Sequence, residues 1–216
     1  MSPTTSQRAT RRPASETREG ILGVAQELFY WDGIRATGVD RLAAEAGVAP
    51  TALYRQFGSK DGLIAAYIQG VADAYRDFIL EETSTQHGTP RERILRLFDA
   101  TLAAVQPELC RGCPFLILLA EIPDSSVEAH QIAVATKQWV REQLHSLVRE
   151  LVGVTRSPRR QRDGEVLGDQ LALVLEGIYG SVQALGATGP AKHARLTAEV
   201  LLDAFEVARP SGRARR

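Results

Sequence analysis

Apolar residues recur at helical spacing along most of the chain, and Gly, Pro and Asp separate the segments that carry them. The first segment starts near Ser15 and ends at Asp32-Gly33, and its apolar residues fall on one helical face. No two alternating segments are joined by a hairpin-type turn. The pattern therefore predicts an all-α protein.

Longer helices are predicted after residue 60. Their expected ranges are 60–82, 90–105, 114–120, 125–152, 165–185 and 191–208. Residues 83–89 are expected to form a polar loop. Residues 155–164 are basic and contain Pro158, so a mobile loop is expected there. Both ends, 1–13 and 209–216, carry Arg and small residues and are expected to lack structure of their own.

Two short helices around a glycine are predicted within residues 37–57, TGVDRLAAEAGVAPTALYRQF. Gly47 suits the turn after the first helix, and Pro50 suits the first position of the second. Burial of Leu53 and Phe57 would leave an outer face that is small and polar and carries one guanidinium. This is the layout of a helix-turn-helix, but structural helical hairpins share it, so both interpretations stay open at this point.

Several residues at fixed spacing between Ile21 and Leu63 resemble the tetracycline-repressor (TetR) family. The matching elements are IL-x-x-A-x-x-LF from Ile21, Gly33-x-x-x-Thr37, Ala46-Gly47-Val48, Leu53-Tyr54-x-x-Phe57 and Ser59-Lys60-x-x-Leu63. The resemblance covers the DNA-binding domain only. It implies a three-helix helix-turn-helix domain at 15–62 and a helical ligand-binding and dimerisation domain at 63–208, flanked by a basic arm (1–14) and a basic tail (209–216).

The resemblance also implies which residues contact DNA. Those expected to face the bases are Pro50, Thr51, Ala52 and Arg55, and those expected to contact phosphates are Thr37, Tyr54, Gln56 and Lys60. The Arg55 guanidinium can meet O6 and N7 of guanine, and Lys60 stands where a helix start offers N–H groups to a phosphate. Tyr54 packed between helices and Lys60 merely solvated are the alternatives.

Two positions depart from the family pattern. Gly38 stands where Ser or Thr is often found, which removes a hydroxyl contact. Ala49 replaces the hydroxyl residue that often caps the recognition helix, so a weak cap is expected there.

The last two predicted helices are apolar and rich in small residues, and the resemblance implies that they pair two subunits. The residues expected at this interface are Leu171, Leu175, Ile178, Val182, Leu185, Leu196, Val200, Leu201 and Phe205, with Gly177, Gly180 and Ala184 allowing close approach. The alternative is that these faces complete the core of one subunit.

Aromatic and polar residues in the same half are candidates for an inducer cavity, although each would also serve as core. The expected ligand-binding residues are Tyr67, Phe98, Phe115, Glu121, Trp139, Tyr179 and Gln183, with Tyr75 and His130 as further candidates. Few charges interrupt the apolar faces, which favours an apolar or aromatic inducer.

Two cysteines stand out in the segment LCRGCPFLILLAE. A G-C-P-F run occurs in a subset of TetR-like regulators, and Cys113 would precede a helix there. Cys110 and Cys113 then have three interpretations: small buried apolar residues, a redox-sensing thiol pair, or zinc ligands. Zinc is disfavoured because the four histidines lack companion spacing.

Composition limits the remaining possibilities. Apolar residues make up 44% and charged residues 24%, which is typical of a globular protein, and the formal net charge is zero. A zero net charge disfavours general nucleic-acid coating but permits a local basic face. Arg8, Arg11 and Arg12 would form an arm along DNA or simply a solubilising tail. No signal peptide or apolar run of membrane-spanning length is visible, so a cytoplasmic location is expected.

No enzymatic motif is present, so no catalytic residue, metal or cofactor is expected. The sequence thus predicts a homodimeric repressor that binds a palindromic double-stranded operator and is released by a small-molecule inducer. The alternatives are a helical ligand-binding or scaffold protein without DNA binding, and a thiol redox sensor using Cys110 and Cys113.

Overall fold

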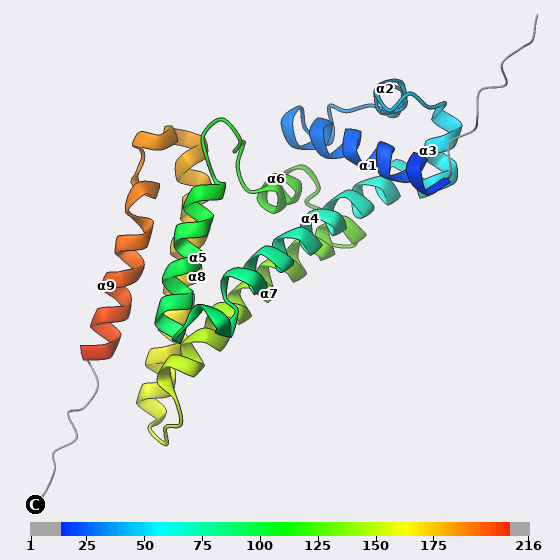
Figure 1. Ribbon diagram of the computed structural model, residues 1–216. Helices are drawn as coiled ribbons and strands as arrows, with labels where there is room; N and C mark the ends of the chain where they lie inside the picture. Colours follow the sequence, from blue (N-terminus) through cyan, green and yellow to red (C-terminus); the bar gives the residue numbers. More distant parts are fainter. Residues whose placement is uncertain (1–13, 208–216) are drawn as a thin grey trace, which may run out of the picture. The chain divides into compact units, whose positions relative to one another are not determined.

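The computed structural model describes residues 14–207, which form α-helices and three short 3₁₀ turns (Figure 1). The helices are α1 (Ala14–Trp31), α2 (Val39–Glu45), α3 (Pro50–Phe57), α4 (Lys60–Glu82), α5 (Pro90–Ala104), α6 (Pro114–Glu121), α7 (Glu128–Val152), α8 (Pro158–Leu185) and α9 (Ala194–Val207). The 3₁₀ turns lie at Thr85–His87, Gly186–Thr188 and Pro190–His193. Within this described part there is no strand, and the all-α prediction is confirmed. The predicted arm and tail lie outside the described residues, apart from residue 14.

The described residues form two compact units, one up to Tyr67 and one from Ile68 onward, and α4 contributes to both. We call them the helix-turn-helix unit (14–67) and the helical unit (68–207). The core of the helix-turn-helix unit contains the fully buried Ile21, Leu42 and Leu53. The expected domain limits at 62 and 63 stay a prediction.

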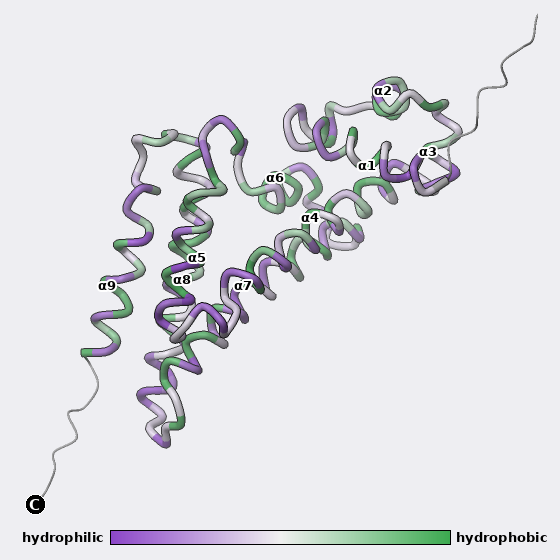
Figure 2. The backbone as a smooth tube through the Cα atoms, viewed as in Figure 1, coloured by the Kyte–Doolittle hydropathy of each residue, from purple (hydrophilic) through white to green (hydrophobic). Residues whose placement is uncertain are grey.

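In the helical unit, α8 packs against α7 and also against α9, while α5 and α6 lie against α7. The core is built from apolar side chains that these helices turn toward one another, including Phe98, Leu144, Leu171 and Leu202. Green and purple alternate along the helices in Figure 2, which is the colouring expected of amphipathic helices.

Local cap residues explain where helices begin. Thr89 and Glu92 form a reciprocal capping box at the start of α5, and Pro90 occupies its first turn. The expected mobile loop at 155–164 is wrong, because α8 already begins at Pro158. Ser157 accepts a hydrogen bond from the Arg160 N–H, so the proline is the first residue of a capped helix and not a helix breaker.

The two faces of α8 serve different purposes. Leu171, Leu175, Ile178 and Val182 are buried in the core of this chain, so their expected place in a subunit interface is wrong. The opposite face leaves Leu173 74% exposed. Helical periodicity shows that both faces carry apolar residues. It does not show which face packs against other helices of the same chain.

On α9 the division is similar. Phe205 is buried and Leu201 partly buried, whereas Leu196 and Val200 remain exposed, as does Leu185 at the end of α8. Residues Pro158–Thr188 are the one described stretch that is long and apolar enough to cross a membrane, which the sequence reading missed. Length and composition are weak evidence, since core helices of soluble proteins meet the same criterion.

Candidate nucleic-acid interface

The turn between α2 and α3 has the backbone that a helix-turn-helix requires. Gly47 has a φ of +64°, a conformation that glycine adopts without steric cost, and the Val48 N–H donates to the Ala43 carbonyl at 2.9 Å. Ala49 precedes α3 without a side-chain hydrogen bond to its N-terminus, as the missing hydroxyl predicts. Pro50 in the first turn supplies the fixed φ that starts the helix.

The outer face of α3 is open. Pro50, Thr51 and Arg55 are exposed and Tyr54 is 49% exposed, whereas Ala52 and Gln56 are half-buried at its sides. The Arg55 guanidinium has no hydrogen-bond or ion-pair partner among the described residues. Leu53 on the opposite side is fully buried and fixes the rotation of the helix. The predicted base-facing residues therefore share one accessible surface.

Thr37 does not lie on this surface. Its side chain is fully buried, and its hydroxyl donates to the Gly33 carbonyl at 2.7 Å. A side chain enclosed in this way cannot reach a phosphate, so that part of the expectation is corrected. The sequence spacing Gly33-x-x-x-Thr37 reflects this internal bond, which holds the loop between α1 and α2.

Two long basic side chains also bind loop or helix-end carbonyls. The Lys60 ammonium donates to the Ile34 carbonyl at 2.8 Å, and it keeps further N–H groups for a phosphate. The Arg18 guanidinium donates to the Gln56 carbonyl at 3.1 Å and lies 4.4 Å from the centre of the Phe57 ring. Sequence reasoning missed Arg18, whose only signal was its place near the start of α1.

The helix-turn-helix unit has no excess of positive charge. Residues 14–67 contain five basic and seven acidic side chains. Arg41 is exposed, but it forms ion pairs with Asp32 and Glu45. Hydrogen bonds to Glu45 and Asp32 raise the pKa of Arg41 above its ordinary value. Arg8, Arg11 and Arg12 lie outside the described residues. The local positive charge on the outer face of α3 thus comes from Arg55.

Comparison with known proteins agrees with this geometry. Residues 21–67 match the family of bacterial regulatory proteins of the tetR type. A crystal structure of a TetR-family transcriptional regulator from Streptomyces coelicolor has a TM-score of 0.72 to this chain, with 28% identity, and the match covers 89% of this chain and 94% of that one. Residues 21–67 of this chain therefore form a TetR-family domain.

Curated relatives match over a shorter part. The transcriptional repressor NemR of Escherichia coli K12 is 30% identical over 112 residues, which is 51% of this chain and 56% of that protein. The repressor KstR2 of Mycobacterium tuberculosis H37Rv is 33% identical over 93 residues, or 41% and 44% of the two chains. The chain therefore spans about half the length of these relatives. TetR-family members are regulators and not enzymes, in line with the missing enzymatic motifs.

The expected ligand-binding residues of this chain do not all come together. Tyr67 is buried in the helix-turn-helix unit, where its ring lies 5.4 Å from that of Phe29, so the structure removes it from a cavity in the helical unit. Phe98 is fully buried in the core. The sequence pattern could not separate these core positions from a cavity lining, because both are apolar and aromatic.

Phe115 and Tyr179 do meet, beside Tyr75. The Tyr75 and Phe115 rings are 5.8 Å apart, and the Tyr75 and Tyr179 hydroxyls lie near enough to affect each other's pKa. Lys137 contributes its ammonium 5.4 Å from the Phe115 ring, paired with both carboxylate oxygens of Glu176 at 2.7 Å. We call these five residues the aromatic cluster. Burial raises the pKa of both tyrosines, so they stay neutral.

The other three candidates have different surroundings. Trp139 is half-buried against the core, 6.0 Å from the Arg76 guanidinium, and Glu121 is half-buried at the end of α6. Gln183 is exposed, and its side-chain oxygen stands so close to Gly112 that a Cβ there would be 2.6 Å away. Gly112 has a φ of +130°, a backbone conformation that favours the glycine in the G-C-P-F run.

Cys110 and Cys113 are both buried as unpaired thiols. Burial limits access of oxidants, and it fits their interpretation as small apolar residues. Among residues 14–207 no three potential ligand side chains are grouped so that they could hold a metal ion. The redox-sensor alternative is not favoured.

Proposed function

We propose that this chain is a ligand-responsive transcriptional repressor that binds a palindromic operator as a homodimer. The observation that carries the proposal is the open face of α3, with Thr51, Tyr54 and Arg55 exposed in a TetR-type helix-turn-helix. Arg55 and Thr51 contact base edges in the major groove. Tyr54, Gln56 and Lys60 contact phosphates and set the register.

The test uses DNA selected by the full-length protein from a random pool, followed by binding assays with Arg55→Ala. We expect affinity for the selected site to fall by about fivefold to 150-fold, the effect of losing one bidentate guanine contact. Arg156→Ala is the matched control, since Arg156 is an exposed arginine of the helical unit. Equal affinity and an equal footprint for Arg55→Ala would remove this face from the DNA contact.

The proposed dimer uses the uncovered faces of α8 and α9. Leu173, Leu196 and Val200 are exposed there, and Gly177 and Gly180 leave the neighbouring surface of α8 without large side chains. Covering these exposed apolar side chains with a second copy of the chain is energetically favourable. Two α8–α9 hairpins packed together would form a four-helix bundle. A palindromic site also requires two α3 helices.

The oligomeric state tests this part by light scattering during gel filtration. Leu173→Glu places a charge in the proposed interface and should give a monomer. Leu80→Glu is the control, because Leu80 is also an exposed leucine but lies on α4. A wild-type monomer, or a Leu173→Glu dimer as tight as wild type, would contradict the proposed interface.

The proposed inducer site lies beside the aromatic cluster. Its rings suit an apolar or aromatic molecule, and its hydroxyls and ion pair give polar contacts that orient it. The inducer releases DNA because it binds more tightly to a conformation that cannot hold the operator. A screen for compounds that dissociate the selected DNA, repeated with Tyr179→Phe, tests this site: an inducer whose potency is unchanged by the variant lies elsewhere.

A further inference from the structure

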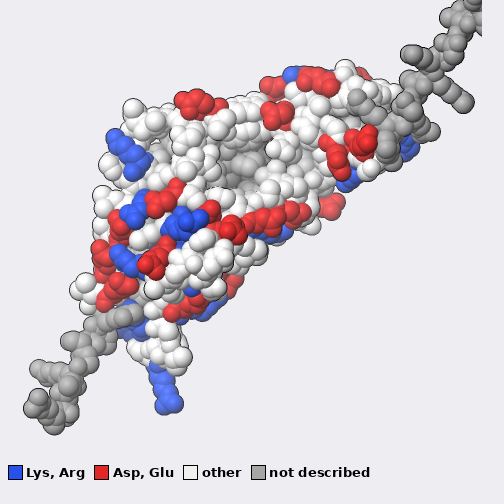
Figure 3. All heavy atoms as spheres, viewed as in Figure 1, with Lys and Arg blue, Asp and Glu red and all other residues white. Residues whose placement is uncertain are grey.

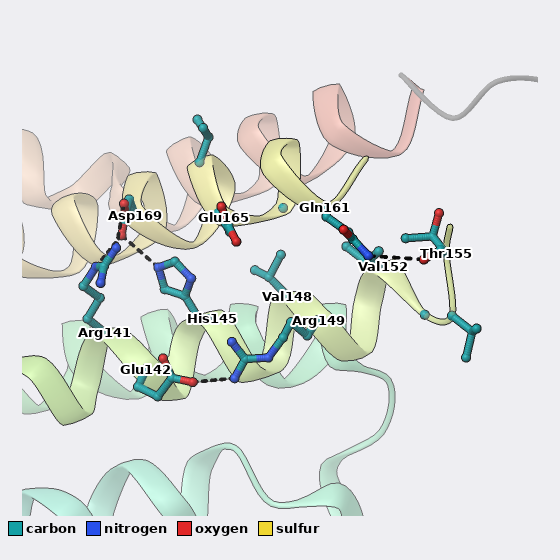
Figure 4. Close-up of a pocket in the computed structure, with 14 residues that line it drawn as sticks. Arg141, Glu142, His145, Val148, Arg149, Val152, Thr155, Gln161, Glu165 and Asp169 are labelled. Carbon is teal, nitrogen blue, oxygen red and sulfur yellow. Dashed lines mark hydrogen bonds and ion pairs between the residues drawn. The ribbon is translucent and has the colours of Figure 1, made fainter. Parts of the chain in front are cut away.

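A cleft of about 780 Å³ lies in the helical unit between α7 and α8 (Figure 4). Its walls are the second half of α7, the loop at 153–155 and the first half of α8. This volume is within the range of small-molecule sites in proteins. The residues that give the cleft its chemistry are Glu142, His145, Val148, Arg149, Glu165 and Asp169.

Two glycines of α8 bring the helix close to α7 at the floor of the cleft. A Cβ on Gly164 would lie 3.1 Å from a methyl carbon of Val152, and one on Gly168 would lie 2.9 Å from the His145 ring. Val148 and the ring of His145 are buried between the helices. The floor is therefore apolar and shaped by close helix packing.

The charges around this floor pair off with one exception. Arg141 binds Asp169 through two hydrogen bonds, of 2.6 and 3.0 Å, and Arg149 binds Glu142 at 2.5 Å. Glu165 makes no hydrogen bond or ion pair with the other described residues, although the Arg141 guanidinium is near enough to interact with its charge, and its carboxylate points from α8 toward α7 in Figure 4. The lining carries two guanidinium groups and three carboxylates, a formal excess of one negative charge.

His145 adds a hydrogen-bond acceptor. Its Nε2 lies 2.8 Å from Oδ1 of Asp169, and because an ionised carboxylate only accepts, Nε2 carries a proton and donates it; in the neutral form of the ring Nδ1 is then the acceptor. Nδ1 then has a lone pair and no partner in the described chain, and it faces the cleft beside Val148 in Figure 4. Arg141 holds the Asp169 carboxylate in place, and this carboxylate in turn orients the His145 ring.

We propose that this cleft binds an organic ammonium ion with a short apolar chain. The ammonium group donates to the Glu165 carboxylate and to Nδ1 of His145, and the apolar chain lies on Val148 and Val152. An anion would meet an unpaired carboxylate, and a neutral alcohol would leave that carboxylate without its counter-charge. The site is separate from DNA binding and does not depend on the proposed function.

The experiment titrates the full-length protein with hexylammonium, hexanol and hexanoate, which share the chain and differ in charge. Binding is followed by NMR through the Cε1–H signals of the four histidines. We expect hexylammonium to shift the His145 signal and to bind about fivefold more tightly than hexanol, the gain from one partly exposed ion pair. Equal binding of the three probes, or a shift confined to other histidines, would overturn the proposal.

Variants at an exposed position separate binding from folding. Glu165→Gln should reduce hexylammonium affinity to that of hexanol, and Glu165→Lys should reverse the preference toward hexanoate. Glu128→Gln is the matched control, an exposed glutamate at the other end of α7, and should bind like wild type. If Glu165→Lys still prefers hexylammonium, the carboxylate is not the recognition group and the assignment fails.

Discussion

Two long basic side chains of the helix-turn-helix unit end on backbone carbonyls, whereas several contacts between helices of the helical unit join two charged side chains. In the first unit, Arg18 and Lys60 donate to the carbonyls of Gln56 and Ile34. In the second, ion pairs connect α5 with α9, α5 with α7 and α7 with α8. Red and blue atoms lie side by side over the helices at the lower left of Figure 3.

The two kinds of contact fix different parts of the structure. A bond to a loop or helix-end carbonyl fixes the backbone itself, and the position of α3 depends on the short segments around it. Ion pairs on helix surfaces only join elements that apolar packing has already placed, so each exposed pair adds little stability. The first unit is therefore the one in which single polar contacts set geometry.

The largest expected effect is the loss of the small core beneath α3. Leu53→Ala should lower the free energy of unfolding by about 2–5 kcal/mol, because it leaves a cavity at a fully buried position. Chemical denaturation measures this change, and DNA binding should fail with it. Leu80→Ala, at a half-exposed position of α4, is the control. A loss below about 1 kcal/mol for Leu53→Ala would mean that the unit repacks easily.

An intermediate effect is expected where the helical unit buries a charge. Arg93 is buried and binds Glu150, with the Thr83 carbonyl as a second acceptor at 3.2 Å. Glu150→Gln should cost about 1–3 kcal/mol of unfolding free energy, since the guanidinium keeps its burial but loses its counter-charge.

The control for this prediction lies on the same helix. Glu142→Gln breaks the exposed Arg149 pair and should leave the unfolding midpoint unchanged. Equal losses in the two variants would show that burial of Arg93 does not matter, and the contrast between the two kinds of contact would weaken.

A smaller effect is expected from one hydroxyl. Thr37→Val keeps the side-chain shape but removes the bond to the Gly33 carbonyl, so the free energy of unfolding should fall by about 1 kcal/mol. Thr197→Val removes a similar bond to the His193 carbonyl on an exposed part of α9 and should cost less. Thermal melts of both variants decide the order, and a larger loss for Thr197→Val contradicts it.

The smallest effect is expected at Asp169 and depends on pH. Hydrogen bonds from Arg141, and then from His145, lower the pKa of this carboxyl to about 2. The stabilisation is present above about pH 4 and is lost as the pH falls through about 2, because the unfolded chain takes up the proton first. Asp169 is half-exposed, so Asp169→Asn should cost at most about 1 kcal/mol near pH 7.

The measurement is a series of denaturation curves between pH 7 and pH 2. The difference between wild type and Asp169→Asn should shrink toward the acid end. A difference that stays constant over this range would show that the Arg141 and His145 contacts do not depend on the ionised carboxylate.

The amino-acid sequence alone predicts the helix positions and the helix-turn-helix. Apolar spacing and terminal signals such as Thr89-Pro90 and Gly47 act within a few residues, so α3 and α4 were predicted with the bounds that the structure has. The sequence does not predict the start of α8, because Ser157-Pro158 is also typical of a loop; in the structure this pair forms an N-cap and a first turn.

The partners of each side chain required the packed molecule. The sequence predicts that Thr37 and Tyr67 are contact residues, but both are buried, and the Tyr67 ring packs against Phe29 of α1. It also predicts that Leu171 is an interface residue, but Leu171 lies in the core of the helical unit. The cleft at His145 and Glu165 was also invisible, since its residues are twenty positions apart. Short-range forces choose where a helix starts and stops, whereas burial depends on which remote faces meet, and that information is spread over the whole chain.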